Sequence, residues 1–169
     1  MFYNKNKDGL PAVRHGFTLV ELLVVIGIIA LLSTLATMAV FAARNTAKIK
    51  KSQSDLAAIA KGIEMLVLDT GEWPGHDTPY VVCATDCDAN EMEDLNVASA
   101  GLMATDGSFS GWIGPYMQIL TLDPWGNNYF YDSDYDVAGT DKAVIGSYGP
   151  NGQGLNLYDS DDIIKIISY

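Results

Sequence analysis

The sequence has few charges and few cysteines for its length. Only 18% of its 169 residues are charged, against roughly 25% in typical globular chains, and this deficit indicates a membrane segment. There are 10 Lys and Arg residues against 21 Asp and Glu residues, a net charge of −11. This acidity excludes a nucleic-acid-binding surface, because neutralising phosphates requires clustered Lys and Arg. The 2 cysteines are too few for a disulfide scaffold.

The charges that are present are unevenly distributed. Residues 1–16 carry a net charge of +2, residues 44–61 carry +4 and residues 62–169 carry −16. Glu21 is the only charged residue between Arg14 and Arg44. The pattern indicates a basic tip, an apolar stretch, a basic collar (residues 44–61) and an acidic body.

The apolar stretch is long enough to cross a membrane. Residues 22–43 are 22 consecutive uncharged positions, and a helix of that length spans roughly 33 Å, against about 30 Å for a bilayer core. A buried core helix is one alternative, but apolar side chains occupy every face and leave no soluble side. A secretory signal peptide is another, but its apolar region is shorter. Basic residues flank both ends, so charge alone leaves the orientation open.

Glu21 stands at the start of the apolar stretch. An ionisable group in or near a membrane span is costly and therefore indicates a functional site. The alternative is a carboxylate that simply extends to the membrane interface.

Residues 16–26 have the sequence GFTLVELLVVI. This string resembles the type IV prepilin signature: a basic leader, then Gly, Phe, Thr, Leu, an apolar residue and Glu, and an apolar helix. The resemblance implies that a prepilin peptidase cleaves after Gly16 on the cytoplasmic side and that the new N-terminus, Phe17, is N-methylated. It also implies the orientation, with the leader inside and the acidic body outside.

The same resemblance gives Glu21 a role in filament assembly. A buried carboxylate is costly unless it is paired, and Glu21 of one subunit can pair with the Phe17 α-amine of a neighbour. Subunits in the correct stagger would then be favoured over misregistered ones. Many pilins carry a Pro in mid-span, whereas this sequence has Met38 near that position.

The remaining sequence predicts an α+β chain, and the resemblance implies that it has a type IV pilin-like fold. Apolar residues at three- and four-residue spacing continue the helix to about Asp69, and Thr70, Gly71 and Pro74 predict its end. A short helix is expected over residues 90–103. The β-rich segments 129–131, 143–148 and 163–167 predict a small antiparallel sheet packed against the helix.

These elements divide the chain into three expected parts. Residues 1–16 form a cleaved leader, residues 17–43 a transmembrane and assembly helix, and residues 44–169 an exported globular domain. Within that domain, residues 72–122 form a variable loop region and residues 123–169 the sheet and C-terminal loop.

A second set of segments resembles the major pseudopilin of type II secretion. They are residues 68–74 (LDTGEWP), 112–117 (WIGPYM), 123–127 (DPWGN) and 147–152 (SYGPNG). Two departures from that family are an insertion at about residues 76–108, which holds both cysteines, and the aliphatic end at residues 163–169.

Cys83 and Cys87 are expected to form a local disulfide outside the membrane, and two free thiols are the alternative. Their three intervening residues exclude Cys-x-x-Cys redox spacing. Only His76 is near as a further soft ligand, so a zinc site is weakly supported.

The acidic residues suggest one metal site. Asp132, Asp134 and Asp136 lack the Gly and the closing Glu of an EF-hand and are expected to be a solvated strand face. The resemblance to major pseudopilins implies a calcium site in the final loop, on Asp159, Asp161 and Asp162, with Ser147 as a further ligand. Uncoordinated surface charge is the alternative.

We therefore expect a structural subunit with no catalytic centre. It is a single-pass protein of the cytoplasmic (inner) membrane that polymerises with itself into a pseudopilus for type II secretion. Its expected partners are the prepilin peptidase, a membrane assembly platform and minor pilins. The alternatives are a true type IV pilin for adhesion, motility or DNA uptake, and, from another class, a membrane-tethered enzyme using two carboxylates.

Overall fold

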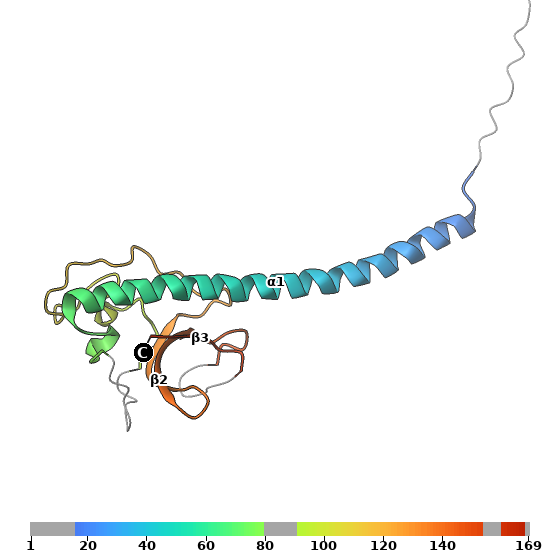
Figure 1. Cartoon of the computed structure of the whole chain (residues 1–169). Coiled ribbons are helices and arrows are strands. Elements are labelled where there is room, and N and C mark those ends of the chain that lie inside the picture. The colour runs from blue at the N-terminus through green and yellow to red at the C-terminus, as the bar shows by residue number, and fades with distance from the viewer. Residues whose placement is uncertain (1–15, 80–90, 154–159, 168–169) are drawn as a thin grey trace, which may run out of the picture. The chain divides into compact units, whose positions relative to one another are not determined.

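The computed structural model describes residues 16–79, 91–153 and 160–167. One long helix, α1 (Leu19–Thr70), is followed by two short 3₁₀ helices, η1 (Pro74–His76) and η2 (Ala98–Ala100). Three strands complete the described part: β1 (Phe130–Asp136), β2 (Asp141–Ser147) and β3 (Ile163–Ile166). The chain divides after Ala43 into two compact units, so α1 belongs to both (Figure 1).

Among the described residues, nothing covers the first half of α1. Its side chains are exposed from Leu19 to Lys48, and by length and composition the helix can cross a membrane, with a mean hydropathy of 2.6 in its most apolar window. The few polar side chains there bond to their own helix: Ser33, Thr34 and Thr37 donate to backbone carbonyls at 2.7–2.8 Å. Such internal bonds make hydroxyl groups tolerable in lipid.

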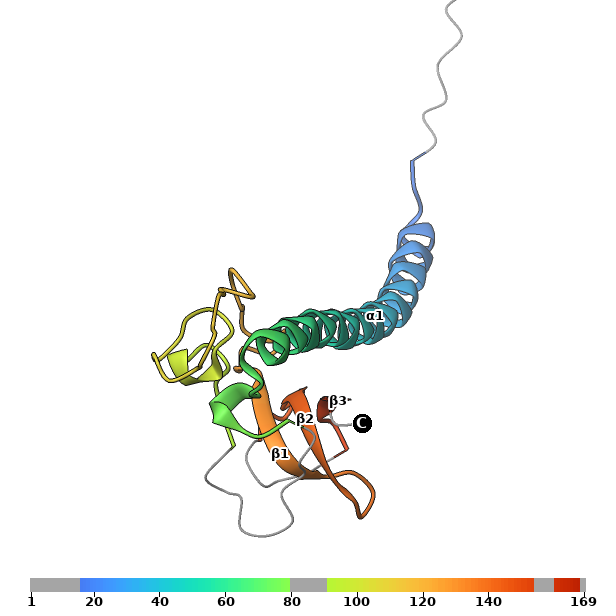
Figure 2. The same ribbon diagram turned by 60° about the vertical axis from the view of Figure 1, so that its left-hand side comes forward.

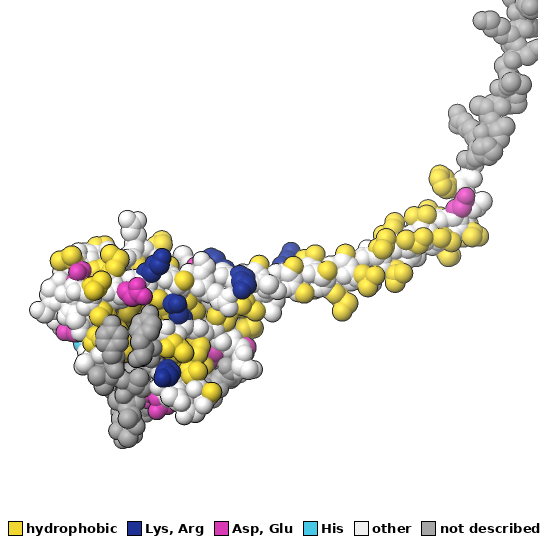
Figure 3. All heavy atoms as spheres, in the orientation of Figure 1, with side chains coloured by type: hydrophobic (Ala, Val, Ile, Leu, Met, Phe, Trp, Pro, Cys, Tyr) yellow, Lys and Arg dark blue, Asp and Glu magenta, His cyan; other side chains and the backbone are white. Residues whose placement is uncertain are grey.

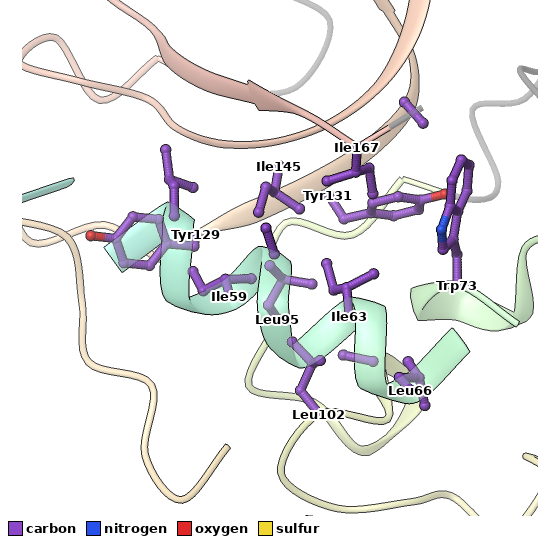
Figure 4. Close-up of a cluster of buried hydrophobic side chains, with 14 of the residues drawn as sticks. Ile59, Ile63, Leu66, Trp73, Leu95, Leu102, Tyr129, Tyr131, Ile145 and Ile167 are labelled. Atoms are coloured by element: carbon purple, nitrogen blue, oxygen red, sulfur yellow. The ribbon is translucent and has the colours of Figure 1, made fainter. Parts of the chain in front are cut away.

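The second half of α1 is amphipathic, as expected. Its buried residues recur every three or four positions and so lie on one side of the helix; they are Ser52, Leu56, Ile59, Ala60, Gly62, Ile63 and Leu66. Figure 4 shows this side packed against side chains from the sheet and the loops, among them Tyr129, Tyr131 and Ile145. This stripe is the core of the Arg44–Tyr169 unit.

The end of α1 lies where the sequence predicts it. Gly71 adopts the left-handed conformation (φ 76°), and its N–H donates to the carbonyl of Val67 at 2.8 Å. A left-handed glycine is the common way to stop a helix, because it carries no Cβ to clash. Trp73, only 2% exposed, then turns back onto the core and meets Tyr131 edge to face.

The sheet is antiparallel with strand order β1-β2-β3, which confirms the expected small antiparallel sheet. Figures 1 and 2 both show it beside the C-terminal half of α1. Side chains alternate across the pleat, so Tyr129, Tyr131, Ala143 and Ile145 reach the core on α1. Phe130 and Val144 lie in a second buried cluster with Tyr135.

The predicted helix over residues 90–103 is wrong. Met92 exchanges two backbone hydrogen bonds with Tyr131, at 2.8 and 2.9 Å, and the Leu95 N–H donates to the Tyr129 carbonyl. The segment therefore extends along the free edge of β1, and the only helical turn described there is η2. Pairing with a strand provides hydrogen bonds that outweigh a weak local helix preference.

The expectation that Asp132, Asp134 and Asp136 form a solvated strand face is also only partly correct. The β1–β2 register shifts between Asp132 and Tyr135, where β1 holds one extra residue. Such a bulge breaks the alternation of side chains. Asp132 is consequently buried (4% exposed), whereas Asp136 is exposed.

Leu66 and Leu68 give a matched test of this core. Leu66 is fully buried and Leu68 is 83% exposed, although they lie two residues apart on α1. We expect Leu66→Ala to lower the free energy of unfolding of the Arg44–Tyr169 unit by about 2–5 kcal/mol, because it leaves a cavity. Leu68→Ala should change it by less than about 0.5 kcal/mol. Urea unfolding measures both; equal effects would contradict the burial pattern.

Candidate functional site

The N-terminus of α1 is organised by a reciprocal pair, Thr18 and Glu21. Thr18 donates to Glu21 Oε2 from both its backbone N–H and its hydroxyl, each at 2.8 Å. The Glu21 N–H in turn donates to Thr18 Oγ1 at 3.2 Å. This is a capping box, in which a Thr and a Glu three residues later satisfy helix-end N–H groups. The Thr-x-x-Glu spacing signals it in the sequence, but sequence reasoning considered only the charge of Glu21.

The residues around this cap are uncovered. Gly16 and Phe17 precede the helix, and Phe17 is 90% exposed. A bulky apolar side chain at the end of an uncovered apolar helix has nothing of its own chain to pack on among the described residues. This end is therefore an exposed apolar surface with one anchored carboxylate.

The final loop brings Asp161 and Asp162 beside different elements. Asp161 accepts from the Asn151 backbone N–H at 3.0 Å and from its side-chain Nδ2 at 2.8 Å. Asp162 accepts from the Tyr135 hydroxyl at 2.8 Å. Gly149 lies so close that a Cβ there would collide with the Asp161 carbonyl oxygen, so the loop is tightly folded around Asp161.

Ser147, the fourth residue expected at this site, is buried below the loop. Its hydroxyl donates to Asp123 Oδ2 at 2.6 Å and accepts from the Gly149 N–H at 3.2 Å. Asp123 uses its other oxygen to bind the backbone N–H groups of residues 125–127. Ser147 thus connects the final loop to that turn. Asp159, and the cysteines Cys83 and Cys87, lie outside the described residues.

A separate acidic cluster, which sequence reasoning missed, consists of Glu91, Asp132 and Asp134. One carboxylate oxygen from each lies within 4.8 Å of the others. The bulge brings in the two aspartates, and the pairing of Met92 with β1 positions Glu91 next to them. The long separation between Glu91 and β1 left no sequence signal for this contact.

Comparisons with known proteins place the chain in a family. The model of the family described as "Prokaryotic N-terminal methylation motif" matches residues 12–42, and that of "Type II secretion system (T2SS), protein G" matches residues 88–165. "Type II secretion system core protein G" of Xanthomonas campestris is 30% identical over 149 residues, 86% of each chain. The chain belongs to the type II secretion core protein G family.

Two further proteins are similar to this chain. Core protein G of Vibrio cholerae is 27% identical over 137 residues, covering 81% of this chain and 83% of the relative. The crystal structure of the major pseudopilin from the type 2 secretion system of enterohaemorrhagic Escherichia coli has a TM-score of 0.48 and 21% identity, covering 73% of this chain and 90% of that chain.

Membership of the protein G family confirms several expectations. The chain is a major pseudopilin of type II secretion with a prepilin-type N-methylation motif, and it is a structural protein rather than an enzyme. The membrane-tethered carboxylate enzyme is therefore rejected. The other filament alternative, a surface pilus subunit, is rejected in favour of the pseudopilin.

In this protein G chain the buried carboxyl of Asp132 has a raised pKa. Burial, the largest cause, acts with the neighbouring Asp134 and Glu91 carboxylates to raise the pKa of its carboxyl to about 7. The Asp134 N–H, which donates to Asp132 Oδ1 at 2.8 Å, opposes the shift. Removing the ionised form from water is the dominant cost.

The raised pKa predicts a pH dependence. The unfolded chain ionises Asp132 near the ordinary value of 3.8, while the folded chain keeps its proton to higher pH, so this group's contribution to stability falls as pH rises between those values. The free energy of unfolding of Asp132→Asn should therefore rise relative to that of wild type between pH 5 and pH 7.5. The expected change in this difference is on the order of 2 kcal/mol. Asp136→Asn, an exposed acid of the same strand, is the control. Parallel pH profiles of denaturant unfolding for wild type and Asp132→Asn would contradict the assignment.

Proposed function

We propose that this chain is inserted in the inner membrane by the first half of α1, loses its leader after Gly16, and then polymerises through that same helix into a pseudopilus. A prepilin peptidase cleaves it and methylates Phe17, and an assembly platform with minor pilins receives it. The observation that carries the proposal is an apolar helix half without cover of its own, which begins at a carboxylate fixed in a capping box.

The uncovered surface of α1 supports a lateral assembly. Hydrophobic side chains gather along the first half of the helix (Figure 3), and many aliphatic residues there are more than half exposed. Such a surface is stable only in lipid or against other apolar surfaces. Moving from the membrane into a helix bundle exchanges one apolar environment for another, so little hydrophobic free energy opposes the transfer.

Because the exchange is nearly neutral for apolar groups, register has to come from polar contacts. Both hydrogen bonds that Thr18 donates to Glu21 are accepted by Oε2. Oε1 can therefore pair with an α-amine from a neighbouring subunit. The capping box fixes the direction of the carboxylate before assembly, so less side-chain freedom is lost on pairing. Glu21 would thereby serve its own helix and the contact between subunits.

Variants at Glu21 separate these two roles. Glu21→Gln keeps a hydrogen-bonding side chain at the capping position and loses the charge, whereas Thr18→Ala weakens the cap and keeps the charge. We expect Glu21→Gln and Glu21→Ala to depress filament yield strongly, because breaking a buried ion pair costs on the order of 3–5 kcal/mol. Thr18→Ala should reduce yield less, since losing a helix cap costs about 1 kcal/mol.

The measurement is the yield of sheared filaments together with the mass of the subunit. All three variants should remain in the membrane fraction and begin at residue 17, which shows that processing is intact. If Glu21→Gln forms filaments like wild type while Thr18→Ala does not, Glu21 acts as a helix cap and the pairing is wrong.

We also propose calcium binding in the final loop, on Asp161 and Asp162 with Asp159. Calcium prefers six to eight oxygen ligands, and the donors that this loop presents are carboxylate and backbone oxygens of a folded, strongly acidic body. Asp161 and Asp162 carry the proposal among the described residues, because they are carboxylates of the loop itself, whereas Ser147 is buried and its hydroxyl donates to Asp123. Bound to the folded state alone, calcium would tie the final loop to the sheet.

Thermal melting tests the calcium site. At a hundredfold excess over its Kd calcium adds about 2.7 kcal/mol, so millimolar calcium should raise the melting temperature over chelator by on the order of 10 °C for a unit of this size. Asp161→Asn with Asp162→Asn should remove the difference. Tyr135→Phe, which deletes only the hydroxyl donor to Asp162, and Asp134→Ala should keep it. Equal melting temperatures in calcium and chelator would contradict the proposal.

A further inference from the structure

His76 is held between two carboxylates from distant parts of the chain. Its Nδ1 lies 2.6 Å from Glu72 Oε2, just after the end of α1. Its Nε2 lies 3.0 Å from Asp106 Oδ2, in a loop 30 residues further on. The ring also stacks on Phe109, with centroids 3.9 Å apart. His76 therefore joins the end of α1 to the loop of residues 105–109.

The protonation state of the ring decides whether both contacts can exist. A carboxylate only accepts hydrogen bonds, and a neutral imidazole has a single N–H donor, whereas the imidazolium has two. The observed geometry places an acceptor at each nitrogen. With a neutral ring, one carboxylate would oppose the lone pair of a nitrogen and would lose its bond.

We propose that His76, Glu72 and Asp106 form a proton-dependent latch, which fastens the loop of residues 105–109 to the end of α1 when the ring is charged and releases it when the ring is neutral. The latch lies in the Arg44–Tyr169 unit and does not depend on the filament proposal.

The electrostatics agree with this geometry. The hydrogen bond with Asp106 is the largest influence and raises the pKa of His76; Glu72 raises it as well, and partial burial opposes both. The same contact lowers the pKa of Asp106. Among the described residues, Glu72 and Asp106 are the charged groups that contact the His76 ring, and Phe109 stacks on its face. The latch is thus closed below the ordinary histidine pKa of 6.5 and opens as pH rises through the raised value.

The Asp106 side is the one expected to open. Glu72 is four residues from His76 on the same short segment, so that contact closes a small loop at low entropic cost. The hydrogen bonds recorded around Asp106 are local: Gly107 binds Thr105 Oγ1, and the Ser108 N–H binds Asp106 Oδ1. These turns can move together once His76 Nε2 no longer donates to Asp106.

The backbone at His76 adds a reason for release. His76 has φ 66°, in the left-handed region next to Gly75 at φ 74°. A residue with a Cβ occupies that region only at a free-energy cost, and the side-chain contacts of His76 help to offset it together with the backbone hydrogen bond from His76 N–H to the Trp73 carbonyl. Losing one of them would favour a change in this turn.

Opening would change the surface at the end of α1 through Phe109. Phe109 is only 6% exposed, and its ring lies between His76 and Gly101, where a Cβ would come within 2.8 Å of it. If the loop moves with Asp106, this aromatic ring loses its cover. The latch would therefore control whether an apolar side chain is available at that surface.

The test is an NMR titration of the full chain in detergent micelles from pH 5 to 9. His15→Gln leaves His76 as the one remaining histidine, so its ring signals are unambiguous. We expect a midpoint above 6.5, and we expect the backbone amide signals of Gly107 and Ser108 to shift with the same midpoint. Adding His76→Gln should make those amide signals insensitive to pH over this range.

Two variants and a control separate a latch from an ordinary surface histidine. Asp106→Asn and Glu72→Gln should each weaken proton binding by His76 several-fold, and Asp106→Asn should also stop the amide signals of residues 107 and 108 from following the ring. Asp94→Asn, whose carboxylate closes a local turn with Asn96, should change neither. A His76 midpoint at or below 6.5, or amide signals that ignore the ring titration in the parent protein, would overturn the proposal.

Discussion

The constraint on which this molecule depends is that one helix must be stable in two kinds of surroundings. α1 runs without interruption from Leu19 to Thr70, yet among the described residues only its second half has apolar partners. There, the stripe from Leu56 to Leu66 forms the larger of the two buried clusters, to which the sheet and the long loops also contribute side chains. The first half must obtain its cover from lipid or from other apolar surfaces.

The charge distribution follows from that division. The apolar half carries one acid and no base, the basic collar lies where the helix leaves the apolar stretch, and the body after residue 61 carries −16. Within the collar, positive charge is used locally: Lys51 pairs with Asp55, which also accepts from the Tyr129 hydroxyl, and Lys48 lies 5.6 Å from the centre of the Trp125 ring. The collar therefore helps to hold the sheet end of the body against α1, in addition to any interaction with lipid headgroups.

Sequence reasoning succeeded where the pattern is local and failed where a distant partner decides. The helix, its end at Gly71 and the three strands follow from periodicity and from turn residues. The helix expected over residues 90–103 was wrong because Met92 and Leu95 bond to β1, and Asp132 was placed at the surface because a bulge is not visible in an alternating string. The partnership of His76 with Asp106 spans 30 residues and has no sequence signature. The Thr18–Glu21 capping box is a different case, because its Thr-x-x-Glu spacing is visible in the sequence and a helix cap can be predicted from it.

That last case shows why a cap and a charge can share one residue. A carboxylate at the N-terminus of a helix is favoured by the local N–H groups and by the helix dipole, so Glu21 has a reason to be there before any neighbour arrives. A free carboxylate entering an apolar bundle would have to lose its water and find a partner at the same moment. One that already accepts two hydrogen bonds from Thr18 has replaced part of that water within its own chain. The cost of burying the remaining charge is then smaller, so in the filament that we propose the α-amine of a neighbour would have to compensate only for the part that Thr18 does not satisfy.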